Sequence, residues 1–181
     1  MTGDTRVICL GNEMVRDDGI GVRVGRVLQR LPLPEQITVE LRRMVGLELL
    51  DELRPDQALL LVDATQTGAQ PGSLSVLQFA EATDLAQAPY CCHGFGLAEV
   101  LVIARRLHPE RLPCRATVVG IEAEELESFG TSLSATLQTA LPEAVATVLV
   151  TLKLPVELQK LGREEAAKWL DWEPSIDQVA G

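Results

Sequence analysis

The chain has 181 residues, which is enough for about one domain with a single hydrophobic core. Hydrophobic residues make up 46% of it and aromatic residues only 3%, so the core must be built mainly from Leu, Val, Ile and Ala. The net charge of −10 argues against a nucleic-acid partner, which needs a basic footprint, and against docking on an anionic membrane.

Neither a spanning helix nor a signal segment is expected, because no apolar run approaches about 20 residues and the first residues lack a charged-then-apolar pattern. The cysteines are Cys9, Cys91, Cys92 and Cys114, and no C-x-x-C pair occurs among them. We therefore expect a reduced, cytoplasmic protein. Cys9 and Cys114 lie in or beside apolar runs and are expected to be buried.

The first part of the chain predicts two strands and two helices. Residues 6–10 form an apolar strand, and a helix follows over residues 19–30 until two prolines end it. Residues 37–41 alternate in polarity and predict a second strand. Residues 46–54 carry leucines at helical spacing and predict a short helix.

The central part continues the alternation of strands and helices. Residues 58–64 form a continuous apolar run, which is typical of a strand buried on both faces. Residues 74–79 predict a strand that pairs antiparallel at an edge of the sheet. A helix over 94–107, a strand over 114–121 and a long helix over 131–152, interrupted or entered again at Pro142, complete the pattern.

We divide the chain into a domain over residues 1–154 and a polar C-terminal extension over 155–181, expected to be partly disordered. The extension holds Trp169 and Trp172, and residues 164–172 predict a short helix. Strands that alternate with helices predict a three-layer α/β/α sandwich with a mainly parallel, twisted sheet of about five strands.

Candidate functional residues follow the strands, at the edge where open α/β sheets bind ligands. Asp17 and Asp18 follow a glycine-rich turn after the first strand, Asp63 ends the central strand, and His93 precedes a predicted helix. Each also has a structural interpretation, since a carboxylate can cap a helix or a turn. We interpret His108, at a helix end, as structural.

Together, two carboxylates and one imidazole are ligands that suit nickel or zinc and leave positions open for substrate. Cys91 and Cys92 are less suitable, because adjacent cysteines cannot easily bind one ion together. No G-x-G-x-x-G, G-x-S-x-G, P-loop or H-E-x-x-H pattern occurs, so the corresponding chemistries have no support.

Three blocks of sequence carry a resemblance to a known family: G-N-E-M-V-R-D-D-G-I-G-V-R-V, L-L-L-V-D-A and H-G-F-G-L-A-E-V-L. Over residues 6–152 the chain resembles the hydrogenase maturation endopeptidases. The resemblance implies that it cuts a C-terminal extension from the large-subunit precursor of a nickel–iron hydrogenase after nickel insertion. It also implies a mainly parallel twisted sheet flanked by helices.

The resemblance places the metal ligands on Asp18, Asp63 and His93, which would approach nickel that the precursor supplies. Cadmium or zinc is expected to substitute for nickel in crystals. Asp17 takes a supporting role, and Asn12 and Gly46 match positions of the surrounding loops.

One segment departs from the family pattern: residues 41–46 read L-R-R-M-V-G, where many members have an aspartate and a Gly-Thr turn. The basic pair is expected to bear on which large subunit is recognised. Two alternatives remain open at this point, a metal-sensing chaperone that binds the precursor without cutting it and a small-ligand binding domain. We expect neither nucleic acid nor membrane as a partner.

Overall fold

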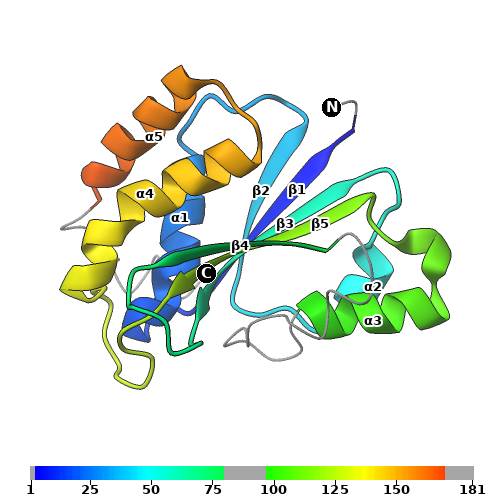
Figure 1. Cartoon of the computed structure of the whole chain (residues 1–181), viewed down its shortest axis with the longest axis horizontal. Helices are drawn as coiled ribbons and strands as arrows, with labels where there is room; N and C mark the ends of the chain where they lie inside the picture. Colours follow the sequence, from blue (N-terminus) through cyan, green and yellow to red (C-terminus); the bar gives the residue numbers. More distant parts are fainter. Residues whose placement is uncertain (1–2, 80–96, 170–181) are drawn as a thin grey trace.

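The computed structural model describes residues 3–79 and 97–169, which fold into one sheet with helices on both faces (Figure 1). The strands and α-helices, in chain order, are β1 (Thr5–Leu10), α1 (Ile20–Leu28), β2 (Ile37–Arg42), α2 (Leu49–Glu52), β3 (Ala58–Thr65), β4 (Leu74–Phe79), α3 (Leu97–Leu107), β5 (Arg115–Glu122), α4 (Ala135–Thr151) and α5 (Val156–Ala167). Two 3-10 turns, η1 (Arg16–Gly19) and η3 (Pro109–Arg111), precede α1 and β5. Each predicted strand is present to within one residue.

The sheet has the strand order β2-β1-β3-β5-β4. β1 pairs in parallel with β2 and β3, and β3 pairs in parallel with β5. β4 lies antiparallel to β5 at one edge, as the sequence predicts. Because four strands are parallel, their carboxyl ends lie together on one side of the sheet. We call that side the carboxyl edge and the opposite side the amino edge.

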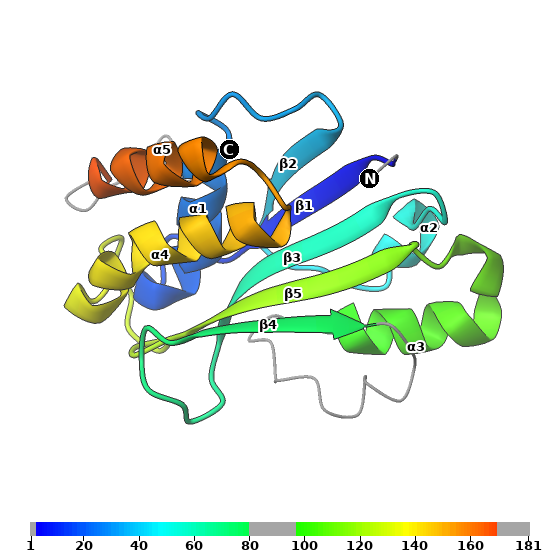
Figure 2. The same ribbon diagram turned by 45° about the horizontal axis from the view of Figure 1, so that its top comes forward.

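Alternate residues of the strands face two separate hydrophobic clusters, as the pleat of a strand requires. Val7 and Cys9 of β1 belong to the cluster formed with α1, α4 and α5. Ile8 and Leu10 belong to the cluster formed with α2 and α3. Figure 2 shows the two groups of helices on opposite faces of the sheet, which confirms the three-layer α/β/α architecture.

The long helix α4 differs from its prediction because it runs without a break through Pro142. A proline inside a helix costs about 3 kcal/mol relative to alanine. Next to it, Leu141, Ala144 and Val145 are fully buried between α1 and the sheet, and their burial offsets that cost. The helix begins after Ser134, whose Oγ accepts a hydrogen bond from Leu137 N at 3.3 Å.

Residues 155–169, the described part of the C-terminal extension, pack against the domain. They form α5, which packs closely on α4. Gly162 allows this close approach because it has no Cβ; a Cβ there would lie 2.5 Å from Leu149 Cδ1. Trp169 is 7% exposed and belongs to the main cluster, with the Arg30 guanidinium 4.6 Å from its ring centre. The predicted helix over 164–172 is therefore displaced, and the packed region extends at least to Trp169.

Two further predictions need correction. The helix expected over residues 46–54 is only the short α2. Cys114 is exposed, although it stands beside an apolar strand, because β5 begins one residue later. Cys9 is buried as expected, and its burial raises the pKa of the thiol well above the usual range. None of the helices in the described segments has the length and apolar character needed to cross a bilayer.

Candidate active site

The carboxyl edge collects the buried acids of this protein. Every buried carboxylate among residues 3–79 and 99–169 lies at this edge or in the loops that follow its strands; these residues are Glu13, Asp17, Asp18, Asp63 and Glu122. An ionised carboxylate is costly to bury unless hydrogen bonds or opposite charges compensate it. The partners of each acid therefore separate structural roles from functional ones.

Asp17 has a structural role. Its side chain is fully buried, and its Oδ2 accepts hydrogen bonds from Glu124 N at 3.1 Å and Glu125 N at 2.9 Å. Its Oδ1 accepts a further hydrogen bond from Ser134 N at 2.6 Å. Asp17 thus joins η1 to the β5–α4 connection and to the start of α4, rather than simply capping its own helix.

Asp18 lies next to this anchor at the end of the first loop. It is 7% exposed, and its Oδ2 accepts a hydrogen bond from Asn12 N at 2.9 Å. Its own backbone N–H donates to Val15 O at 2.9 Å, which closes the η1 turn. Both bonds come from the loop that follows β1, so the position of this carboxylate depends on the conformation of that loop.

Two glycines allow the loop to fold so tightly. Gly11 has a φ of +144°, and a Cβ there would lie 2.1 Å from Asp18 O. At Gly21, a Cβ would lie 2.2 Å from Leu10 O and 2.6 Å from Val62 O. The start of α1 therefore rests directly on the backbones of β1 and β3, which explains the glycine-rich turn of the sequence.

Asp63 is fully buried in β3, two residues before the strand ends. Its neighbours Val62 and Ala64 face the α1–α4 cluster, so the Asp63 side chain points to the opposite face, where α2 and α3 lie. Because Gly21 rests on Val62 O and η1 contacts β3, the segments that carry Asp18 and Asp63 lie side by side. The structure thus brings together two of the three predicted site segments.

The third predicted ligand, His93, lies outside the described residues, as do Cys91 and Cys92. Within the described part, no three His, Cys, Asp or Glu side chains gather closely enough to hold a metal ion. The helix α3, which begins four residues after His93, leads into β5 through η3. Its amino end therefore points toward the carboxyl edge.

A buried ion-pair group supports the same corner, and sequence reasoning did not find it. Glu13, 6% exposed, lies 2.6 Å from Arg26 Nη2 and 3.6 Å from Arg23 Nε. Arg23 also donates to Thr131 O at 2.6 Å. These contacts join the first loop, α1 and the start of α4, and no local pattern in the sequence indicates them.

Glu122, which the sequence places in an acidic loop, is a second structural acid. It accepts hydrogen bonds from Thr65 Oγ1 at 3.0 Å, from Thr67 N at 2.7 Å and from Gly68 N at 2.8 Å. Burial by itself raises the pKa of Glu122, but the hydrogen bonds from Thr67, Thr65 and Gly68 outweigh it and lower the pKa below its usual value. The carboxylate therefore holds the β3–β4 turn in place.

The basic pair of the β2–α2 loop has two different environments. Arg42 donates to Glu52 Oε2 at 2.7 Å and to Glu40 Oε2 at 3.1 Å, so it belongs to an ion-pair network with α2. Arg43 instead donates to Asn12 Oδ1 at 3.2 Å. Asn12 N donates to Asp18, so of the two arginine side chains Arg43 is the one that reaches the loop carrying Asp18.

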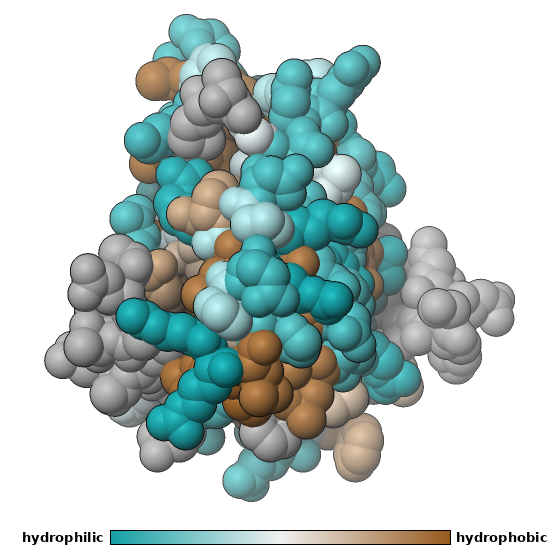
Figure 3. Space-filling model, turned by 90° about the vertical axis from the view of Figure 1, so that its right-hand side faces the viewer, coloured by the Kyte–Doolittle hydropathy of each residue, from teal (hydrophilic) through white to brown (hydrophobic). Residues whose placement is uncertain are grey.

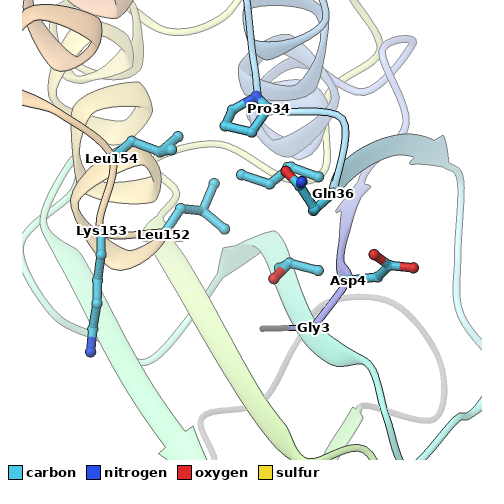
Figure 4. Close-up of a pocket in the computed structure, with 9 residues that line it drawn as sticks. Gly3, Asp4, Pro34, Gln36, Leu152, Lys153 and Leu154 are labelled. Carbon is cyan, nitrogen blue, oxygen red and sulfur yellow. The ribbon is translucent and has the colours of Figure 1, made fainter. Parts of the chain in front are cut away.

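The amino edge contains a pocket of about 750 Å³ that no predicted site residue lines. Its lining comes from the start of β1, the α1–β2 loop and the α4–α5 turn, and Leu152 and Leu154 point toward it while Lys153 points away (Figure 4). The side of the molecule that carries α2 and α3 is mainly hydrophilic, with hydrophobic surface low on that face, at the height of α3 (Figure 3). Neither feature brings reactive groups together.

The fold and its acid-rich edge define an α/β protein with a ligand-binding carboxyl edge. Comparison with known proteins narrows this class: the family model of hydrogenase maturation proteases matches residues 22–151, and the chain belongs to that family. The matched range includes Asp63 and His93 and begins after Asp18. The resemblance found in the sequence is therefore confirmed, and the enzyme is an endopeptidase.

Individual relatives agree with this assignment. The hydrogenase 2 maturation protease of Escherichia coli is 30% identical over 149 residues, which cover 81% of this chain and 89% of that protein. The hydrogenase expression/formation protein HoxM of Cupriavidus necator is 30% identical over 138 residues, covering 75% of this chain and 67% of that one. Among solved structures, the hydrogenase maturating endopeptidase HybD from E. coli has a TM-score of 0.68 at 28% identity and covers 83% of this chain and 92% of its own.

Proposed function

We propose that this endopeptidase removes the C-terminal extension of a nickel–iron hydrogenase large-subunit precursor after nickel insertion, and that Asp18, Asp63 and His93 approach the precursor's nickel. The observation that carries the proposal is the meeting of the Asp18 and Asp63 segments at the carboxyl edge, both side chains being buried there. Family membership supports hydrogenase processing.

The other buried acids have partners that explain them without a substrate. Asp17 accepts three backbone N–H groups, Glu13 faces two arginines, and Glu122 holds a turn. Asp18 and Asp63 are the other two buried acids of the described chain, and carboxylate oxygens are suitable ligands for a divalent ion. The segments that carry them lie side by side at the carboxyl edge, which supports them as the groups that meet the nickel.

His93 is the proposed third group because of its place in the sequence. The helix α3 begins four positions after His93, and extended chain spans at most about 14 Å over four positions. The amino end of that helix points toward the carboxyl edge. An imidazole added to two carboxylates gives the mixed nitrogen and oxygen donor set that suits nickel or zinc.

The reaction is hydrolysis of one peptide bond. Water adds to the scissile carbonyl carbon, the C–N bond breaks, and the leaving amine takes up a proton. The precursor's nickel either polarises the carbonyl or activates the water, and a carboxylate of the site acts as the base.

The test is to incubate the purified protein with the nickel-loaded large-subunit precursor of the same organism and with the nickel-free precursor. We expect a shortened large subunit only from the nickel-loaded form. A stable complex without shortening would instead support a non-cleaving chaperone. Cleavage that does not depend on nickel would refute nickel recognition while leaving the protease activity in place.

A second experiment tests the ligand assignment. His93→Ala is expected to abolish processing with unchanged circular dichroism, because a loop imidazole adds little to a hydrophobic core. A crystal soaked with cadmium or zinc should show one ion bound by Asp18, Asp63 and His93. Normal processing by the His93 variant would contradict the assignment.

A further inference from the structure

Phe129 is the most exposed large hydrophobic residue among the described residues, with 88% of its surface accessible. It lies in the connection between β5 and α4, which follows a strand at the carboxyl edge. Leaving such a side chain in water forgoes roughly 1.5–3 kcal/mol of burial free energy. The chain has only three phenylalanines, so the exposure of one of them at this edge calls for an explanation.

Hydrogen bonds hold this connection in one conformation. Its first part is anchored on Asp17 through Glu124 N and Glu125 N. The Glu125 side chain then accepts Glu127 N at 2.9 Å and Ser128 N at 3.2 Å. The backbone that carries Phe129 is therefore held in place, and a preorganised loop loses less conformational entropy when a partner binds it.

The connection is also joined to the loop that carries Asp18. Gly130 N donates to Met14 O at 3.0 Å, and Arg16 N donates to Gly130 O at 2.8 Å. Val15, which accepts the Asp18 N–H, forms a β-bridge with Gly130. Phe129 thus stands next to a backbone that leads in a few residues to the proposed nickel-binding acid, and Met14, 38% exposed, lies on the adjoining loop.

Charges around Phe129 indicate the kind of segment that fits there. Glu124 and Glu127 are both exposed and precede Phe129 in the same connection. An apolar anchor with carboxylates in the same short segment complements an apolar side chain that has Lys or Arg next to it. The same acids, in a protein of net charge −10, disfavour nucleic acid, an anionic membrane and a second copy of this chain.

We propose that Phe129 and Met14, with Glu124 and Glu127, form a docking surface for the hydrogenase large-subunit precursor, which binds it through an apolar side chain flanked by basic residues. The proposal rests on the proposed function, because the surface adjoins the site where that precursor would be cut. Its role is to add binding energy outside the site of peptide-bond hydrolysis, in the way that exposed aromatic anchors dominate other interfaces.

The experiment compares Phe129→Ala with Leu107→Ala, using nickel-loaded precursor, with two readouts: the dissociation constant of the complex and the kinetics of cleavage. Leu107 is a matched control, since it is 64% exposed but ends α3 close to the amino edge. We expect Phe129→Ala to raise Kd and KM about tenfold with kcat unchanged, Phe129→Leu to restore most of the loss, and Leu107→Ala to change neither.

Charge reversal tests the flanking acids. Glu127→Lys should raise Kd above the wild-type value and reduce the dependence of binding on salt. Wild-type values of Kd and KM for Phe129→Ala, or an equal loss for Leu107→Ala, would overturn the docking surface. Loss of a concentration-dependent dimer in Phe129→Ala, seen by sedimentation, would also overturn it, because the occupant would then be a second copy.

These outcomes separate the two proposals. If the wild type binds the precursor through Phe129 but leaves it uncut, the docking surface stands and the proposed function falls. If the wild type cuts the precursor and Phe129→Ala cuts it equally well, the function stands and the docking surface falls. A wild type that neither binds nor cuts the precursor overturns both.

Discussion

The two edges of the sheet are built from the same strands, yet they differ in what they bury and what they expose. The carboxyl edge holds every buried carboxylate of the described chain and presents Phe129 and Met14 to solvent. The amino edge has an open pocket bordered by Leu152 and Leu154, where no acid is buried. An ionised carboxylate is costly to bury without partners, and hydrogen bonds or arginines compensate Asp17, Glu13 and Glu122 at the carboxyl edge.

The largest difference between the edges is expected in activity. Asp63→Asn should lower the rate of precursor cleavage at least about a hundredfold, because a carboxylate that acts as base or metal ligand contributes that much or more. Gln36→Ala, at the amino-edge pocket, should leave the rate unchanged. Timed cleavage assays on gels measure both. Similar rates for the two variants would remove the functional distinction between the edges.

The next largest effect is expected from Gly21→Ala. The new Cβ would meet Leu10 O at 2.2 Å and Val62 O at 2.6 Å, and both are backbone atoms that cannot rotate away. We expect the free energy of unfolding to fall by about 3 kcal/mol, and processing to fall because Asp18 moves with the helix.

Gly25→Ala is the comparison for that variant, since its Cβ would meet side chains and no backbone atom: Leu41 Cδ2 at 2.3 Å, which can move, and Cys9 Cβ at 2.8 Å, which cannot rotate away. It should cost about 2 kcal/mol and spare processing, because it lies one turn further from Asp18. Urea unfolding and the cleavage assay decide between these outcomes. Equal losses in the two variants would show that α1 does not position the site.

Asp17→Asn tests whether the neighbouring acid is structural. The amide has one acceptor oxygen where the carboxylate has two, so one of the three bonded N–H groups would face an NH₂ group. We expect the free energy of unfolding to fall by about 2 kcal/mol. Urea denaturation measures it, and Glu124→Gln, at an exposed acid of the same connection, should be nearly neutral.

The smallest effect concerns acid stability, away from the site. The hydrogen bond from Arg42, with a further one from Arg6, lowers the pKa of Glu52 to about 2. A lowered pKa stabilises the fold above the ordinary value near 4.5, and that contribution disappears as pH falls toward 2. Glu52→Gln should therefore flatten the loss of stability between pH 4.5 and 2.

Urea midpoints across that pH range measure the change. Glu143→Gln, which removes an exposed ion pair with Arg163, serves as the control and should leave the pH dependence as it is. A Glu52 variant with the wild-type pH profile would contradict the assigned network.

The strands were predictable because each one carries a continuous or alternating apolar run, and such a run marks the residues that a strand buries. The sequence proposed Asp18 and Asp63 as site residues from their places near the ends of two strands, and the structure brings their segments side by side. Their separation from Asp17 was not predictable, since its three N–H partners come from Glu124, Glu125 and Ser134, more than a hundred residues away.

Local composition misled where packing decided the outcome. Pro142 indicated a break, but the burial of its neighbours keeps α4 continuous. The charged residues after 154 indicated a loose extension, yet Gly162 allows α5 to approach α4 and Trp169 enters the core. In both cases the deciding contacts join distant segments, which a pattern read along the chain does not contain.

The sequence by itself determined the α/β class, the order of the strands along the chain and the family, because hydrophobic period and motif spacing are local properties. Only the tertiary structure showed which distant backbone groups and arginines compensate Asp17, Glu13 and Glu122. The reason is that burial and hydrogen bonding, which set the cost of a charge, depend on neighbours supplied by other parts of the fold.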